Sequence, residues 1–188
     1  MKNKINKTIK GLLFSNGLIL TAGAMLGPIY AIFVNELGGD ILDAGMTFGV
    51  FSFAAFLTTI FSGIYLDKNK NNHTVLTLGY ILLAVGFLGY LFVNSIMALL
   101  LVQIIIGIGE AIYAPAFDGL FTKFLDTGKQ NTEWGMWEGM DYLSKAMGAI
   151  LGGIIAKFLG FDVLFIIMSL FCLWGAAYML KHKTLCEE

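Results

Sequence analysis

The sequence predicts an all-α, polytopic membrane protein with six transmembrane helices. Two observations support this fold class. Of the 188 residues, 57% are apolar and 13% are charged, whereas soluble proteins carry about 25% charged residues. The apolar residues also fall into six long stretches, which short polar segments separate. A soluble domain of this length could not bury so much apolar surface, so a water-soluble globular fold is excluded.

Each stretch is long enough to cross a bilayer, because a helix needs about 20 mainly apolar residues to span roughly 30 Å of hydrocarbon. None shows the alternation that is typical of a membrane β-barrel. Only helices and closed barrels satisfy their backbone polar groups in lipid, so the stretches are predicted to be helices. The predicted spans, which form one bundle over residues 1–188, are 11–34, 44–66, 75–93, 96–117, 134–159 and 163–180.

Polar segments bound the first three spans. The first span follows a lysine-rich start, contains Pro28 and ends at the segment Asn35–Asp43. The second span ends where the polar segment Asp67–Thr74 begins, and the third follows that segment. Because a proline inside a helix removes a backbone hydrogen bond, we expect a kink at Pro28.

The last three spans are bounded in the same way. Only Asn94 and Ser95 separate the third span from the fourth, which contains Pro115 and is also expected to be kinked. The segment Asp118–Glu133 leads into the fifth span. The short segment Gly160–Asp162 then joins the fifth span to the sixth.

The lysines predict the orientation in the membrane, because cytoplasmic loops carry an excess of basic residues. All 12 basic residues are lysines, and a cytoplasmic N-terminus places ten of them on the cytoplasmic side. We therefore expect a multi-pass protein of the cell inner membrane or plasma membrane, held in the lipid bilayer with both termini in the cytoplasm. The ten lysines are Lys2, Lys4, Lys7, Lys10, Lys68, Lys70, Lys123, Lys129, Lys181 and Lys183.

An internal repeat relates the second span to the fifth, at an offset of 90 residues. Three spans separate the copies, so they cross the membrane in opposite directions. This is the pattern of a 3+3 inverted-topology repeat, which several secondary transporters contain. A chance likeness between two glycine-rich helices is the alternative. The recurring glycines are Gly45 and Gly135, Gly49 and Gly139, and Gly63 and Gly153.

The loop after the second span carries a recognisable motif. Gly63, three further residues, Asp67 and the basic Lys68 follow one another in the predicted cytoplasmic link. This loop resembles the signature loop of the major facilitator superfamily, although Lys70 stands where that family usually has glycine. The resemblance implies that Gly63, Asp67 and Lys68 form a conformational-switch loop. An ordinary solvated loop is the alternative.

The fourth span carries a second likeness to the same family. Gln103 precedes the run Gly107-Ile108-Gly109-Glu110-Ala111, which resembles a family pattern in which a basic residue precedes a glycine-rich run. Gln103 replaces the usual arginine, so any proton-coupling role of that arginine does not carry over. The resemblance implies half of a major-facilitator fold, and secondary active transport by alternating access.

The resemblance also implies a partner. Members of this family ordinarily have twelve spans in two six-helix halves, with the substrate bound between the halves. The present chain corresponds to the first half. We expect a homodimer, because one half leaves a cavity-lining face uncovered. A C-terminal half, with the chain as the truncated N-terminal half of a twelve-helix transporter, is the alternative.

Three ionisable residues stand out within the predicted spans, because a charged side chain costs about 2.5–3.5 kcal/mol at mid-bilayer. Glu110 lies in the fourth span, and Asp141 and Lys145 lie four residues apart on one face of the fifth. We expect them to form a polar cluster along the path of the substrate or a proton. A buried ion pair that fixes the register of the two spans is the alternative. Further candidates for this path are Glu138, Tyr113 and Gln103.

Several classes of function find no support in the sequence. It contains no HExxH, GxSxG or Walker motif, and both histidines fall in predicted cytoplasmic segments. We expect no enzymatic activity, no metal and no cofactor, and the net charge of −1 gives no reason to expect a nucleic-acid partner. The sequence therefore predicts a transporter of an unidentified small solute. A non-transporting membrane interaction or scaffold subunit is the alternative.

Overall fold

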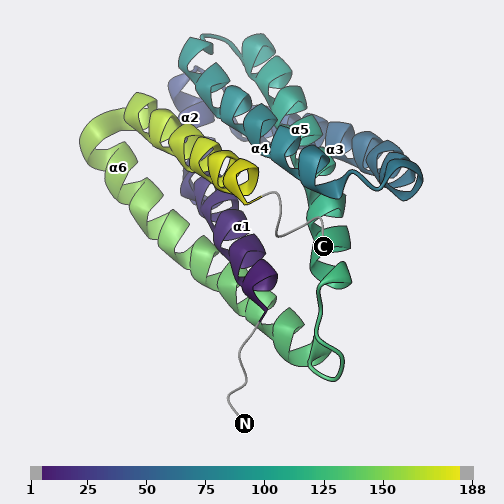
Figure 1. Ribbon diagram of the computed structural model, residues 1–188. Helices are drawn as coiled ribbons and strands as arrows, with labels where there is room; N and C mark the ends of the chain where they lie inside the picture. The colour runs from purple at the N-terminus through teal and green to yellow at the C-terminus, as the bar shows by residue number, and fades with distance from the viewer. Residues whose placement is uncertain (1–5, 183–188) are drawn as a thin grey trace.

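The computed structural model describes residues 6–182, and within this range all regular secondary structure is helical (Figure 1). Lys2, Lys4, Lys183 and Cys186 lie outside the described residues. Five of the helical segments are long and apolar enough to cross a membrane. The all-helical class is therefore confirmed, while the count of six crossings stays a prediction.

The first predicted span consists of three helical segments. Helix α1 (Lys7–Leu26) begins at Asn6, whose side chain caps the helix by accepting a hydrogen bond from the Thr8 N–H. A 3₁₀ turn, η1 (Gly27–Ile29), then leads into α2 (Tyr30–Glu36). Pro28 has no N–H to donate, so the regular helix is interrupted at the predicted position.

The next elements follow the predicted spans but extend beyond them. Helix α3 (Ile41–Asn69) begins with a capping box between Asp40 and Asp43. Helix α4 (Asn72–Gly89) passes into a 3₁₀ turn, η2 (Tyr90–Phe92). Helix α5 (Ile96–Lys123) contains Pro115.

The fifth and sixth predicted spans lie within one continuous element. Helix α6 (Gln130–Lys181) has 52 residues, and a straight helix of that length would extend about 78 Å. It is interrupted at Gly160, whose φ of 85° and ψ of 171° are non-helical. The chain folds back there into two arms, 130–159 and 161–181 (Figure 1). The predicted break at Gly160–Asp162 thus coincides with the interruption.

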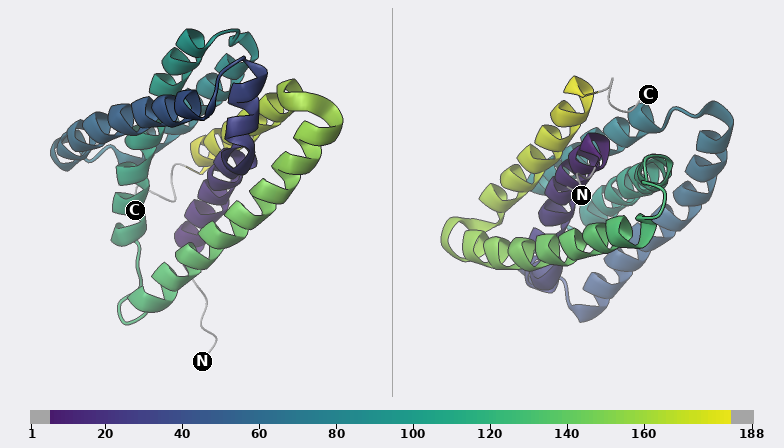
Figure 2. Two further views of the ribbon diagram at one scale, coloured as in Figure 1. Left: turned by 180° about the vertical axis from the view of Figure 1, so that it is seen from behind. Right: turned by 60° about the horizontal axis from the view of Figure 1, so that its bottom comes forward.

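The helices pack in an interleaved order. Helix α1 lies between the two arms of α6, while α5 contacts both α3 and α4 (Figure 2). Close contacts depend on residues that lack a side chain: a methyl group at Gly152 would overlap the backbone carbonyl of Met25, and one at Gly107 would lie 2.5 Å from that of Phe51. In contrast, α3 buries only Thr47 and Leu66.

Candidate functional site

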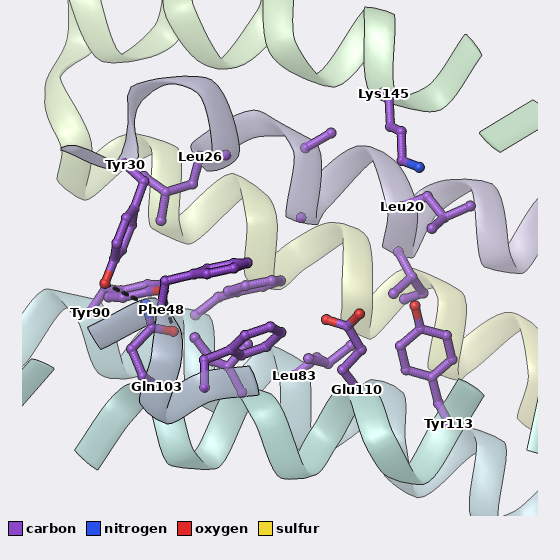
Figure 3. A pocket seen from close by; sticks show the side chains of 17 residues that line it. Leu20, Leu26, Tyr30, Phe48, Leu83, Tyr90, Gln103, Glu110, Tyr113 and Lys145 are labelled. Carbon is purple, nitrogen blue, oxygen red and sulfur yellow. Dashed lines mark hydrogen bonds between the residues drawn. The ribbon is translucent and has the colours of Figure 1, made fainter. Parts of the chain in front are cut away.

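A cavity of about 460 Å³ lies between α1, α3, α4, α5 and the first arm of α6. Aliphatic side chains such as Leu20 and Leu83 line it, together with a few polar groups (Figure 3). Its volume falls in the range of about 300–1,000 Å³ that is usual for small-molecule sites. Six aromatic side chains form much of its wall: Tyr30, Phe48, Phe51, Phe87, Tyr90 and Tyr113.

Four of the predicted site residues line this cavity. Glu110, Tyr113 and Gln103 come from α5, and Lys145 comes from the first arm of α6. Glu110 and Tyr113 are three residues apart, so they lie on neighbouring positions of one helix face. In Figure 3, the side chains of Glu110 and Lys145 point into the cavity from opposite sides.

Asp141 lies behind Lys145 and balances its charge. Lys145 Nζ lies 2.6 Å from Asp141 Oδ2, and the two residues are one helical turn apart. The Asp141 side chain is 9% exposed and that of Lys145 is 60% exposed. The carboxylate is therefore buried, while the ammonium group reaches the cavity. Because both residues belong to α6, this ion pair does not join two spans.

The side chain of Glu110 lines the cavity and forms no ion pair or hydrogen bond with the described residues 6–182, although the charge of Lys145 acts on it across the cavity. Since Lys145 is already paired with Asp141, the three ionisable groups together carry a net charge of −1 in their ordinary protonation states. The cavity thus combines largely apolar walls with one unbalanced carboxylate.

A chain of hydrogen bonds connects four elements beside the cavity. The Tyr90 hydroxyl donates to the Gln103 carbonyl oxygen at 3.5 Å, and the Gln103 amide donates to the Tyr30 hydroxyl. The Tyr30 hydroxyl donates to Thr47 Oγ1 at 2.6 Å, and Thr47 donates to the backbone carbonyl of Asp43 at 2.7 Å. The side chain of Gln103 thus donates one hydrogen bond and accepts one within the protein.

Sequence reasoning missed Tyr30, Thr47 and Tyr90 as parts of this site. Tyr30 lies 73 residues from Gln103 and Tyr90 lies in a different span, 13 residues before it. A lone tyrosine or threonine is ordinary in an apolar helix. One local signal was available for Tyr30, which follows the helix-breaking Pro28 by two residues.

Glu138 is placed elsewhere. It lies on the first arm of α6 but is exposed, and it does not line the cavity. The structure therefore brings Glu110, Lys145, Tyr113 and Gln103 together around one cavity, with Asp141 behind them.

The predicted switch loop borders a second hollow of about 310 Å³, between the end of α3, the start of α4 and α5. Gly63 and Asp67 line it, together with Pro115, whereas Lys68 is exposed and does not. Lys70 caps α3 in the left-handed conformation, with φ of 53°. This conformation explains why glycine is favourable at this position of the motif.

Comparison with known proteins places the chain in a family. The profile of the Major Facilitator Superfamily matches residues 12–184. The chain is 28% identical to the uncharacterized MFS-type transporter MJ1560 of Methanocaldococcus jannaschii, over 78% of this chain and 39% of that protein. It is 24% identical to the proton-coupled antiporter flippase LtaA of Staphylococcus haemolyticus, over 76% of this chain and 36% of that protein.

A further relative differs in length. The uncharacterized MFS-type transporter YitZ of Bacillus subtilis is 23% identical, over 85% of this chain and 97% of that protein. The chain thus spans about two fifths of the length of MJ1560 and LtaA, and its match covers nearly all of YitZ.

Proposed function

The chain belongs to the major facilitator superfamily, and from this premise we propose that it is a unit of a secondary active transporter. It moves a small solute across the cell membrane by alternating access, without covalent chemistry. The observation that carries this proposal is the cavity of about 460 Å³, which combines apolar walls with an unpaired carboxylate. Ionisable groups within a membrane are costly and usually mark a pathway for a substrate or an ion.

The proposed architecture is one domain of six spans in two inverted triplets, with the arms of α6 as the fifth and sixth spans. The packing supports it. Helix α1 contacts both arms of α6, since Gly17 lies beside Met140 and Gly11 lies beside Tyr178. Helix α5, three spans later, contacts α3 and α4. A methyl group on Gly17 would lie 3.7 Å from Ser144 Oγ, and one on Gly107 would lie 3.3 Å from Ala54 Cβ. The two pairs are related by the offset of the repeat, because Gly17 and Gly107 are 90 positions apart and so are Ala54 and Ser144.

The glycines of the same repeat support the presence of a partner that packs against this chain. We propose that this partner is a second copy of the chain. A methyl group at any of the six recurring glycines would meet nothing within 4 Å. Glycines spaced four apart allow membrane helices to approach closely, yet within one chain no helix packs closely against these positions. The glycines, called here the open glycine stripe, are Gly45, Gly49, Gly63, Gly135, Gly139 and Gly153.

Amine crosslinking in native membranes tests the homodimer. A dimer is expected for the natural chain, and Gly49→Trp should reduce it, because a large side chain would fill the open glycine stripe. Leu78→Trp is the matched control, since Leu78 is an exposed residue of α4, outside the stripe. Crosslinks to a different, longer protein would favour a C-terminal half as the partner, and monomer alone would contradict both.

Both termini are proposed to lie in the cytoplasm, as the lysine distribution predicts. Gly63, Asp67 and Lys68 are proposed to form the switch loop. The hollow that Gly63 and Asp67 line supports this role, because it lies where α3, α4 and α5 meet and leaves room for relative movement of these helices.

Glu110, Lys145 and Asp141 are proposed to act in the substrate or proton path, with Tyr113 and Gln103 beside them. The geometry supports this role over a purely structural pair, because the Asp141–Lys145 pair lies within one helix and its ammonium group reaches the cavity. Glu138 is not included, since it lies outside the cavity lining.

Flux through proteoliposomes tests the transport function. The purified chain is reconstituted with and without an imposed pH gradient, and uptake is measured for a labelled amino acid, a sugar and an organic cation. We expect uptake of one class, and its loss in Glu110→Gln. Glu138→Gln is the matched control, because it removes an exposed carboxylate outside the cavity. Absence of flux for every class would favour a non-transporting interaction subunit.

A further inference from the structure

We propose that the cavity binds an organic cation of single positive charge and apolar, largely aromatic body, with its charge placed at Glu110. This inference deepens the proposed function by naming the substrate class of the same site. It follows from the charge, the hydrogen-bonding capacity and the walls of the cavity.

The charge of the cavity favours a cation. Lys145 is neutralised by Asp141, whose carboxylate lies 2.6 Å from the ammonium group. The Glu110 carboxylate has no ion pair or hydrogen bond among residues 6–182, and it faces Lys145 only across the cavity. A charge in apolar surroundings is weakly screened, so an anion would be repelled by Glu110 and a cation attracted to it. The single unbalanced carboxylate matches a single positive charge.

The remaining polar groups do not suit a polyhydroxylated solute. A sugar requires many hydrogen-bond partners in its site, because each unpaired polar group costs affinity. Gln103 and Tyr30 already bond each other, and they also bond Tyr90 and Thr47. The polar groups left for a ligand are therefore mainly those of Glu110, Lys145 and Tyr113.

A bare metal cation is not favoured either. Calcium takes six to eight oxygen ligands, and magnesium takes six. No group of three or more His, Cys, Asp and Glu residues suited to a metal occurs in the described part of the chain. Glu110 contributes two oxygens and has no second carboxylate beside it in the cavity lining.

The walls suit an aromatic or alkylated cation. Positive charge on an organic group is attracted to the faces of aromatic rings, and this is how quaternary ammonium groups are bound. The six aromatic side chains of the cavity offer such faces together with apolar contact area. Tyr113, one turn from Glu110, combines both contacts near the carboxylate (Figure 3).

The test uses two probes of one shape and opposite charge. Binding of labelled tetraphenylphosphonium to the full chain in lipid nanodiscs is measured after subtraction of the signal from empty nanodiscs. We expect saturable binding of this cation and none of the tetraphenylborate anion. Equal binding of both probes, or of neither, would overturn the proposal.

Variants then locate the charge. Glu110→Gln keeps the shape of the side chain and should weaken binding of the cation at least tenfold, whereas Glu138→Gln should leave it unchanged. Size-exclusion profiles and melting temperatures show that each variant is folded. Undiminished binding to a folded Glu110→Gln variant would overturn the assignment to Glu110.

Binding and flux separate this inference from the proposed function. Binding of tetraphenylphosphonium without transport of any solute would support the cation site and contradict the transporter. Transport of another solute, without binding of the cation, would support the transporter and contradict the cation site.

Discussion

The hydroxyl of Ser62 on α3 donates a hydrogen bond of 2.7 Å to the backbone carbonyl of Ala111 on α5. This carbonyl would ordinarily accept from the N–H of residue 115, four positions later, but Pro115 has none. The side chain of one helix thus supplies the donor that the proline removes from another. Ser62 also lies 3.1 Å from the carbonyl of Thr59 in its own helix.

This relationship predicts a double-mutant result. Ser62→Ala should lower the free energy of unfolding by about 1–3 kcal/mol, because the carbonyl of Ala111 is then left without a partner. In a Pro115→Ala background, the restored N–H should make the same change nearly neutral. Denaturant titration in detergent measures both. Ser52→Ala, at an exposed position of α3, is the control, and equal losses in both backgrounds would contradict the explanation.

Lys70 should be replaceable by glycine with a gain in stability. Its left-handed conformation costs an L-residue about 1–2 kcal/mol. Glycine avoids this cost, but part of the gain is offset because glycine loses more conformational entropy on folding. The net expected gain is about 0.5–1 kcal/mol, read as a higher melting temperature. Lys70→Ala removes the same charge without relieving the backbone. A rise in both variants would point to charge rather than conformation.

Neighbouring glycines of α6 should respond in opposite ways to alanine. Gly152→Ala should destabilise the protein by about 1–3 kcal/mol, because the added methyl group would overlap the backbone of Met25 on α1. In the monomeric chain, the methyl group of Gly153→Ala would meet nothing within 4 Å, so this variant should be neutral or stabilising by up to about 1 kcal/mol, since alanine favours helices. Similar melting temperatures for the two variants would contradict the packing of α1 against α6.

Tyr30→Phe should disconnect the hydrogen-bonded chain beside the cavity. It removes the donor to Thr47 and the acceptor for the buried Gln103 amide. A loss of about 1–3 kcal/mol in the free energy of unfolding is expected, because Gln103 is left unsatisfied. Tyr65→Phe, at an exposed position of α3, is the control. If both variants unfold alike, the chain contributes nothing to stability.

The sequence predicted best what depends on nearby residues. The apolar stretches located the helices, and Pro28 located the interruption of the first span. The four-residue spacing placed Asp141 and Lys145 on one helix face, where they form an ion pair. Such features follow from helix geometry alone. Glu138 shows where helix spacing alone is insufficient. It lies three residues before Asp141, but it does not line the cavity.

Contacts between distant segments could not be predicted in the same way. His73, expected in a cytoplasmic loop, is instead buried at the start of α4, where its Nε2 lies 2.8 Å from the carbonyl of Met179. The link between Tyr30 and Gln103 likewise joins residues 73 positions apart. Both depend on how helices pack, and no local periodicity encodes that arrangement.

Gly160 determines the direction in which the last part of the chain runs. Its positive φ turns the polypeptide back on itself within what would otherwise be a single rod. Residues with a side chain rarely adopt that torsion. One residue thus makes the two arms of α6 run in opposite directions, and any side chain at position 160 would oppose that reversal.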